Sequence, residues 1–201
     1  KLQTDAKVVL GGVNMADDDP LTLNFYMARL TTDGILDTTF QTDGTSTFAI
    51  GTSVDWIHEM AVQPDGKIAI ASTYQTEPDW SNTDYGLVRL DTDGSFDTSF
   101  NTTGILRRDL DANISVAPTG MALQPGGKIL YSGMTQAGQM EIFRMLSDGS
   151  VDTSFATDGV YAQQIGGVAI GNTVKAKPNG KLCSAGAGNT FADFALLCVW
   201  P

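Results

Sequence analysis

The sequence has few cations, one histidine and no long apolar run, and each shortage argues against a class of protein. With 12 Lys and Arg against 23 Asp and Glu, the formal net charge is -11. Such a chain has no basic face for phosphates, so a nucleic-acid partner is excluded. The single histidine, His58, is too little for a His-rich metal site. The apolar runs are far shorter than the roughly 20 residues that span a bilayer, so we expect no membrane insertion.

Good helix formers are scarce as well, because Glu and Lys occur only 3 and 7 times. Asp, Gly and Thr are abundant instead, with 20, 22 and 23 copies. Asp and Gly favour turns, whereas Thr favours strands. The composition therefore predicts an all-β fold, in a chain that is long enough to bury a core.

Three motifs recur in the same order along the chain, at a spacing of about 60 residues. The first is a tight turn that leads into a strand, Gln-Pro-Asp-Gly-Lys-Ile at 63–68, where Pro fixes φ and Asp-Gly accepts the positive φ of a hairpin turn. Its other copies lie at 3–8, 124–129 and 177–182. The second motif is a strand with a central arginine. This arginine is Arg29, Arg89 or Arg144, and Cys198 takes its place in the fourth copy.

The third motif follows each arginine strand and ends on an aromatic residue. It reads Asp-Gly-Ser-Phe-Asp-Thr-Ser-Phe at 93–100, and similar segments lie at 33–40 and 148–155. Its second aspartate, such as Asp97, can accept backbone N–H bonds in the turn, and its final Phe is expected in the core. The repeated arginines are most simply explained as partners of these aspartates; a ring of cationic ligand-binding groups is the alternative.

Laid out by strand, the motifs predict four-stranded antiparallel units in a row. An N-terminal half unit occupies 1–44, and three complete units occupy about 45–104, 105–159 and 160–201. The first strands of these units are expected near 45–50, 105–110 and 160–165. Such repetition is typical of a β-propeller, so the predicted fold is a single all-β, β-propeller-like repeat domain.

Together the three motifs resemble the delta-sixty repeat family of bacterial secreted and surface proteins, over nearly the whole chain. The resemblance implies a β-propeller-like fold and an extracellular or cell-surface location as part of a larger protein, with no catalytic residues defined for the family. The sequence departs from the repeat at its two ends. Thr4 and Ala6 replace the Pro and Gly of the first turn, and Cys198 replaces the arginine.

Three and a half units are fewer than the four or more blades of an ordinary closed propeller. We therefore expect an upstream part of a longer parent protein, or a homo-oligomer that covers the end strands, such as a trimer at the tip of a fibre. These two expectations are compatible.

Both cysteines, Cys183 and Cys198, lie in the last hairpin, at positions where the other repeats carry different residues. The midpoint between them falls where the hairpin should turn, so we expect the two side chains to face each other across the strands. A disulfide there would close a loop of about 15 residues, worth ~3 kcal/mol, and it would suit an oxidising, extracytoplasmic compartment. Two small buried thiols are the alternative.

Signatures of catalysis are mostly absent, and the sequence predicts that the chain is not an enzyme. It has no nucleophile elbow, phosphate-binding glycine loop or Cys-x-x-Cys pair. His58 is interpreted as a structural or surface residue, and no cofactor is expected. Calcium is an alternative, because Asp91, Asp93 and Asp97 resemble a short oxygen-ligand loop. Ordinary Asx turns are the simpler interpretation of these residues.

Residues that differ between the repeats are better candidates for binding, because recognition is usually placed on irregular loops of a regular scaffold. The loop at 73–84 combines aromatic rings with carboxylate and amide groups, as carbohydrate sites do, and the first hairpin loop adds a second polar cluster. The candidates are Tyr74, Glu77, Asp79, Trp80, Asn82 and Asp84 in the former, and Asn14, Asp17, Asp18 and Asp19 in the latter. A solvated hairpin tip with a buried Trp is the alternative.

The function predicted from the sequence is a non-enzymatic binding or adhesion module of a larger bacterial surface or secreted protein. Its irregular loops would face a cell-surface glycan or protein, in one form at the tip of a surface fibre. Two other functions stay open. One is a purely structural repeat or cap without a ligand, and the other is a glycan-degrading enzyme.

Overall fold

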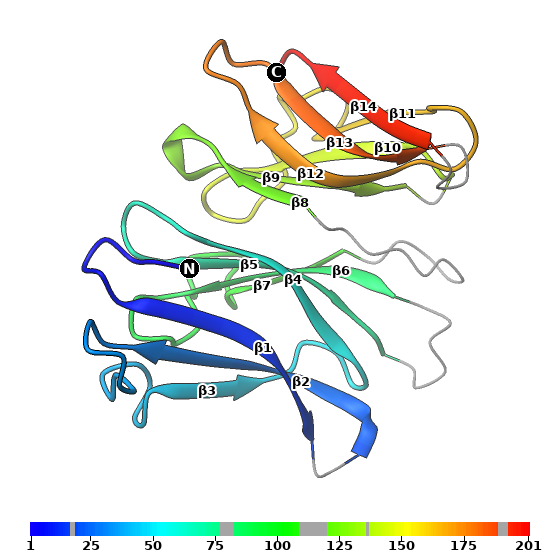
Figure 1. Cartoon of the computed structure of the whole chain (residues 1–201). Helices are drawn as coiled ribbons and strands as arrows, with labels where there is room; N and C mark the ends of the chain where they lie inside the picture. Colours follow the sequence, from blue (N-terminus) through cyan, green and yellow to red (C-terminus); the bar gives the residue numbers. More distant parts are fainter. Residues whose placement is uncertain (17–18, 77–82, 109–119, 136, 189–192) are drawn as a thin grey trace.

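The computed structural model of the chain describes residues 1–16, 19–76, 83–108, 120–135, 137–188 and 193–201. These residues form fourteen strands in four antiparallel sheets, which lie one above another (Figure 1). The predicted fold class, an all-β, propeller-like array of antiparallel units, is confirmed. The helical structure in the described residues is one short 3-10 turn, η1 (Pro125–Gly127). Among the same residues, no helix is long and apolar enough to span a membrane.

We number the sheets I to IV in chain order, and within each sheet consecutive strands are neighbours. Sheet I contains β1 (Val8–Ala16), β2 (Asp19–Leu30) and β3 (Thr45–Phe48). Sheet II contains β4 (Asp55–Val62), β5 (Ile68–Tyr74), β6 (Asp84–Leu90) and β7 (Ile105–Arg108). Sheet III contains β8 (Gly120–Leu123), β9 (Ile129–Met134), β10 (Met140–Met145) and β11 (Val160–Gln163). Sheet IV contains β12 (Ile170–Ala176), β13 (Leu182–Gly188) and β14 (Asp193–Val199).

The short strands β3, β7 and β11 form close to their expected positions, but each is the last strand of the preceding sheet. The sheets therefore run across the unit boundaries at 45, 105 and 160 instead of beginning there. The reason is a glycine four residues after the third motif, whose carbonyl accepts a hydrogen bond from the backbone N–H of the repeated arginine. In sheet II this is the 2.8 Å hydrogen bond from Arg89 N to Gly104 O. This bond places the following strand, β7, beside β6 of the same sheet.

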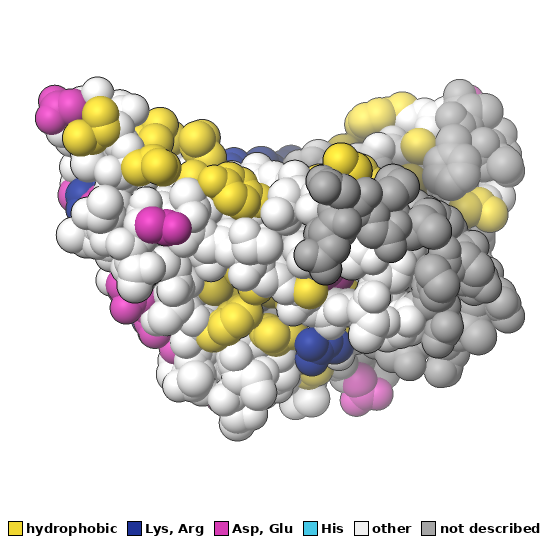
Figure 2. Space-filling view, turned by 90° about the horizontal axis from the view of Figure 1, so that it is seen from below, with side chains coloured by type: hydrophobic (Ala, Val, Ile, Leu, Met, Phe, Trp, Pro, Cys, Tyr) yellow, Lys and Arg dark blue, Asp and Glu magenta, His cyan; other side chains and the backbone are white. Residues whose placement is uncertain are grey.

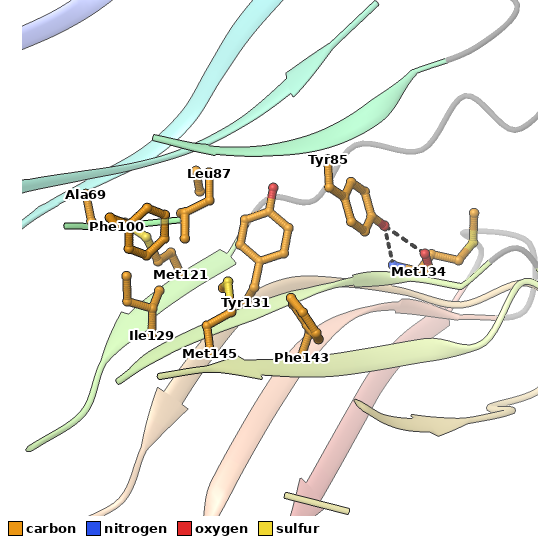
Figure 3. Packing of buried hydrophobic residues seen from close by; sticks show 11 residues of the cluster. Ala69, Tyr85, Leu87, Phe100, Met121, Ile129, Tyr131, Met134, Phe143 and Met145 are labelled. Atoms are coloured by element: carbon orange, nitrogen blue, oxygen red, sulfur yellow. Dashed lines mark hydrogen bonds between the residues drawn. The ribbon is translucent and has the colours of Figure 1, made fainter. Parts of the chain in front are cut away.

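Three hydrophobic clusters fill the spaces between successive sheets. Successive residues of a strand point to opposite faces, so Ile68 and Ile70 of β5 pack toward sheet I, whereas Ala69 and Ala71 pack toward sheet III. Figure 3 shows the cluster between sheets II and III. Sheet II is covered on both faces, which is why every residue of β5 and β6 is buried.

The repeated lysine, arginine, aspartate and phenylalanine of a sheet contact one another, and we call this set of contacts the latch. In sheet II, the Asp97 carboxylate accepts hydrogen bonds from Lys67 Nζ at 2.8 Å and Ser99 Oγ at 2.6 Å, and it pairs with Arg89 Nε. The Arg89 guanidinium lies over the Phe100 ring, 4.7 Å from its centroid. The equivalent ion pairs are Arg29–Asp37 in sheet I and Arg144–Asp152 in sheet III. The predicted pairing of the repeated arginines with turn aspartates is confirmed.

The latch also joins one sheet to the next. Arg29 donates a hydrogen bond to the Thr92 carbonyl of sheet II. Beside this bond, a Cβ atom on Gly94 would lie 2.7 Å from the Phe40 ring, and Gly94 has a φ of +86°. Only glycine fits this position without strain. The Asp-Gly turn of sheet II thus receives the arginine and the phenylalanine of sheet I.

In sheet IV, Cys198 stands where the other sheets carry the latch arginine. The strands β13 and β14 of this sheet are tied by a disulfide between Cys183 and Cys198, which are opposite each other in the register with Cα atoms 4.1 Å apart. The predicted disulfide is confirmed.

Candidate functional site

The strands that flank the two candidate loops, β1 with β2 and β5 with β6, meet on the same side of the stacked sheets (Figure 1). We call this the hairpin end. Some of the candidates fall outside the described residues, namely Asp17, Asp18, Glu77, Asp79, Trp80 and Asn82. Asp19 begins β2. Asn14 of β1 pairs with Asn24, and its Oδ1 atom is buried without a hydrogen-bond partner among the described residues.

Tyr74 and Asp84 lie at the base of the β5–β6 hairpin and not on its surface. They face each other in the register, and only 4% and 3% of their surfaces are exposed. Beside them, Gln75 Nε2 donates a 2.9 Å hydrogen bond to Thr83 Oγ1. Tyr74 packs in the cluster between sheets I and II. The prediction that Tyr74 and Asp84 contact a ligand is therefore corrected, because packing between sheets removes them from the surface.

Near the hairpin end, an ion pair joins sheet II to sheet III, with a fully buried carboxylate and a partly exposed guanidinium. Arg108 donates hydrogen bonds of 2.7 and 3.2 Å to the two carboxylate oxygens of Glu141, which is fully buried. The guanidinium also lies 4.6 Å from the centroid of the Phe143 ring. The sequence patterns did not predict this pair, although a signal existed. Glu141 is one of only 3 glutamates, and it stands where the other repeats carry Tyr26 and Gly86.

Two tyrosines complete this cluster, and Figure 3 shows how Tyr85 reaches Met134 of the next sheet. The Tyr85 hydroxyl donates to Met134 O at 2.7 Å and accepts from Met134 N at 2.9 Å, while the Tyr131 hydroxyl donates to Ser72 O at 2.9 Å. Burial, together with the charge of Glu141, raises the pKa of both tyrosines, so they stay neutral. The void beside them is about 10 Å³, room for one water at most. This cluster therefore fixes sheets II and III and offers no space for a ligand.

Asp55 is a second buried carboxylate near the same end, opposite Tyr74 in the register of β4 and β5. Its oxygens accept hydrogen bonds from Ile50 N at 2.7 Å and Gly51 N at 3.0 Å. Burial raises the pKa of Asp55 to about 6, although the two N–H groups act in the opposite direction. The residue fixes the segment that leads into β4.

The first strands of sheets II, III and IV, which are the edge strands β4, β8 and β12, line a cleft of about 350 Å³. Its lining is partly aliphatic, with Met60 and Leu123, and includes the charged side chains of Glu59 and Lys175. Glu59 accepts a 2.9 Å hydrogen bond from Met121 N, so its carboxylate ties β4 to β8. The volume falls in the range of small-molecule sites. This cleft was not predictable from the sequence, because its walls come from strands that are far apart in the chain.

The three aspartates weighed as calcium ligands have partners within the protein. Asp97 is bonded to Lys67 in the latch, and Asp91 lies 3.0 Å from the same lysine. The Asp93 carboxylate accepts hydrogen bonds from the N–H and the hydroxyl of Ser95. In the described parts of the chain, no group of three or more His, Cys, Asp or Glu side chains could hold a metal ion. The three residues act as turn and ion-pair partners.

His58 occupies a β-bulge at 57–59, where its Nε2 lies 2.9 Å from Thr73 Oγ1. Burial lowers its pKa, so the ring is neutral near pH 7. A bulge recurs in β12 at 171–173, which is the equivalent place in sheet IV. Because a bulge occurs at the same place in two sheets, the geometry supports a structural interpretation of His58.

Comparison with known proteins supports the fold. Residues 22–40 and 63–100 match the model of a family described as a domain of unknown function (DUF5122) that forms a beta-propeller. The chain contains β-propeller repeats. No curated protein matches it. Among solved structures it resembles one titled "Crystal structure of glucose dehydrogenase", with 14% identity and a TM-score of 0.43, over 98% of this chain and 79% of that chain.

The prediction that the chain is not an enzyme is contradicted by the last comparison, because the matched structure is that of an enzyme. We therefore withdraw it. At 14% identity and a TM-score of 0.43, the likeness transfers no activity, cofactor or substrate to this β-propeller repeat chain.

Proposed function

We propose that this chain is a binding or adhesion module of the delta-sixty type, within a larger bacterial surface or secreted protein. Its ligand is a cell-surface glycan or protein, which contacts the hairpin end. The latch supports this division of roles, because it uses the aspartates, arginines and phenylalanines that recur in sheets I, II and III. Recognition is left to side chains that differ between repeats. The disulfide suits an oxidising, extracytoplasmic compartment.

The observation that carries the proposal is the Arg108–Glu141 pair near the hairpin end, in which Glu141 is fully buried and Arg108 is partly exposed. A buried ion pair often contributes less stability than apolar side chains of the same volume. Its bidentate geometry does, however, fix the end of β7 against β10, and the bonds of Tyr85 to Met134 fix β6 against β9. Rigid strand ends lower the ordering cost of a binding event at the hairpins that they hold.

The first experiment measures binding of the chain to a broad glycan array and to isolated bacterial cell walls. We expect Trp80→Ala to weaken binding by roughly tenfold or more, as for an aromatic residue at the centre of a contact. Trp200→Ala is the matched control, because Trp200 is 62% exposed and follows β14 at the opposite end of the strands from the hairpin. No binding to any array member, or an equal loss in both variants, would contradict the proposal.

A second variant tests the rigid display itself. Arg108→Met combined with Glu141→Met replaces the ion pair by apolar side chains of similar length, so we expect stability to stay the same or to rise. Binding should nevertheless weaken, because Met side chains hold no fixed bidentate geometry. Unchanged affinity in this double variant would show that the ion pair does not serve recognition.

A structural unit without a ligand is the second candidate function. The exposed apolar side chains on the two outermost sheets favour it, since Leu10 and Tyr26 lie on sheet I, and Phe194 and Leu196 lie on sheet IV. Faces of this kind are suited to stacking on other sheets. The absence of binding to the glycan array and to the cell walls would favour this function over the binding module.

A further inference from the structure

The outer face of sheet I has the side chains of an inter-sheet contact, yet no sheet in the described part of the chain lies against it. Leu10, Tyr26 and Leu36 are 47%, 39% and 47% exposed. At the positions of Leu10 and Leu36, sheet II carries Ile70 and Phe96, which pack against sheet I. Figure 2 views the molecule from the side on which sheet I lies, and hydrophobic side chains are visible at the surface.

The turn of the third motif is the receiving half of the latch. In sheet II, the Thr92 carbonyl accepts the hydrogen bond of Arg29, and the Asp93 carbonyl accepts a 2.6 Å hydrogen bond from Gln41 N. The same groups in sheet III are the carbonyls of Ser147, which accepts from Arg89, and Asp148, which accepts from Asn101 N at 2.7 Å. The receiving half therefore recurs with the same donors.

Sheet I carries this receiving half as well, in the carbonyls of Thr32 and Asp33 and in the turn glycine Gly34. Within the described ranges, no side chain or N–H of another sheet bonds to the two carbonyls. Gly34 has a φ of +78°, like Gly94 at +86°. A Cβ atom on Gly94 would meet the Phe40 ring, but a Cβ atom on Gly34 would have nothing within 4 Å. The place that a phenylalanine ring fills in sheet II is thus open in sheet I.

A second copy of this chain does not supply the missing half. The outward sheet of such a copy would be sheet IV, which presents the exposed side chains of Phe194 and Leu196. Sheet IV has Cys198 at the position of the latch arginine, and this cysteine is in the disulfide. The latch phenylalanines Phe40, Phe100 and Phe155 are fully buried within the chain. A partner for sheet I must therefore bring its own arginine and phenylalanine.

We propose that the outer face of sheet I docks one further repeat unit of the same type. The partner is an antiparallel sheet that carries the arginine strand and the third motif. Its arginine donates to the Thr32 carbonyl, its phenylalanine ring lies over Gly34, and its apolar face covers Leu10, Tyr26 and Leu36. The contact continues the stacking of sheet I on sheet II and of sheet II on sheet III.

The experiment adds such a unit to the chain. A duplicate of residues 55–123 is placed directly ahead of Gln3, because Gln124 and Gln3 are equivalent first residues of the first motif. Hydroxyl-radical labelling, read by mass spectrometry, compares Tyr26 and Leu36 in the tandem protein and in the parent chain. We expect their labelling rates to fall roughly tenfold, since both side chains pass from solvent into a packed contact. Leu196 on sheet IV should keep its rate in both proteins.

Two variants test whether the added unit covers the outer face of sheet I through latch contacts or by non-specific association. In the first, R89A and F100A are introduced together in the duplicate only, so that it lacks the donating half. In the second, the duplicate is intact and Gly34→Ala is introduced in sheet I, where the new methyl group would meet the incoming ring. We expect either variant to restore the labelling of Tyr26 to its rate in the parent chain. Gly34→Ala in the parent chain should leave that rate unchanged.

Equal labelling of Tyr26 in the parent and tandem proteins would overturn the proposal, and so would protection that survives both variants. Light scattering on the parent chain tests the other occupant. A dimer in which Tyr26 is already protected would identify a second copy as the partner and would likewise overturn the proposal. A parent chain with exposed Tyr26, combined with latch-dependent protection in the tandem protein, is the expected result.

Discussion

Replacing Asp97 by asparagine tests whether the latch holds the stack of sheets together. One carboxylate oxygen accepts from Lys67 Nζ and Arg89 Nε, and the other accepts from the N–H and hydroxyl of Ser99. Burial acts to raise the pKa of Asp97, but the bonds from Lys67, Ser99 and Arg89 outweigh it and hold the pKa well below its ordinary value of 3.8. Asparagine keeps the shape of this side chain and removes its charge.

The side chains of Asp97 and Arg89 are 3% and 6% exposed, so the asparagine variant leaves a buried guanidinium without its counter-ion. Removing one partner of a buried pair costs ~3–5 kcal/mol. Lys67 is partly exposed and can turn toward water, so we expect a loss near the lower end, ~3 kcal/mol. Asp91→Asn is the matched control. Asp91 pairs with the same lysine at 3.0 Å but is 41% exposed, and such a surface pair is worth at most ~1 kcal/mol.

The measurement is urea unfolding followed by circular dichroism at several pH values, with the disulfide intact. Because the pKa of Asp97 is depressed in the folded state, its contribution to stability is fully present above about pH 4 and is lost as the pH falls below that value. The gap between the wild type and Asp97→Asn should therefore narrow in acid. A loss below ~1 kcal/mol at pH 7, or a loss no larger than that of Asp91→Asn, would refute this account of the latch.

Three further predictions concern single positions. The raised pKa of Asp55, about 6, means that its folded carboxyl binds a proton more tightly than the unfolded one, so its contribution to stability falls as the pH rises from 4 to 7. Relative to the wild type, Asp55→Asn should gain ~2–3 kcal/mol over this interval in urea unfolding, and a constant difference would contradict the assignment. Reduction of the Cys183–Cys198 disulfide should lower the free energy of unfolding by ~3 kcal/mol, with the double serine variant insensitive to reductant; two thiols that alkylate in the native protein without reductant would disprove the bond. Gly94→Ala should cost ~1–3 kcal/mol more than Gly34→Ala in thermal unfolding, because both positions have positive φ but only Gly94 meets a ring; equal losses would argue against that contact.

Residues that differ between the repeats were a partial guide to the candidate binding site. The sequence marked the β5–β6 hairpin as irregular, and the fold does place the ends of these strands at the hairpin end (Figure 1). Tyr74 and Asp84 were nevertheless chosen wrongly as surface residues, because exposure depends on which sheets pack beside a strand. Glu141 carried a usable signal as a departure from the repeat, but its partner Arg108 lies 33 residues away in another sheet. No spacing rule connects the two.

The sequence by itself determined the local structure of this protein. The Pro-Asp-Gly turns, the alternating strands, the glycines at positive φ and the facing cysteines all follow from constraints within a few residues or within one hairpin. Only the tertiary structure decided which sheet each short strand joins and what the repeated arginines contact beyond their own sheet. Arg29 reaches Thr92 across 63 residues, and Glu59 reaches Met121 across 62. Contacts at that separation depend on how whole sheets stack, and stacking is set by the summed burial of their faces.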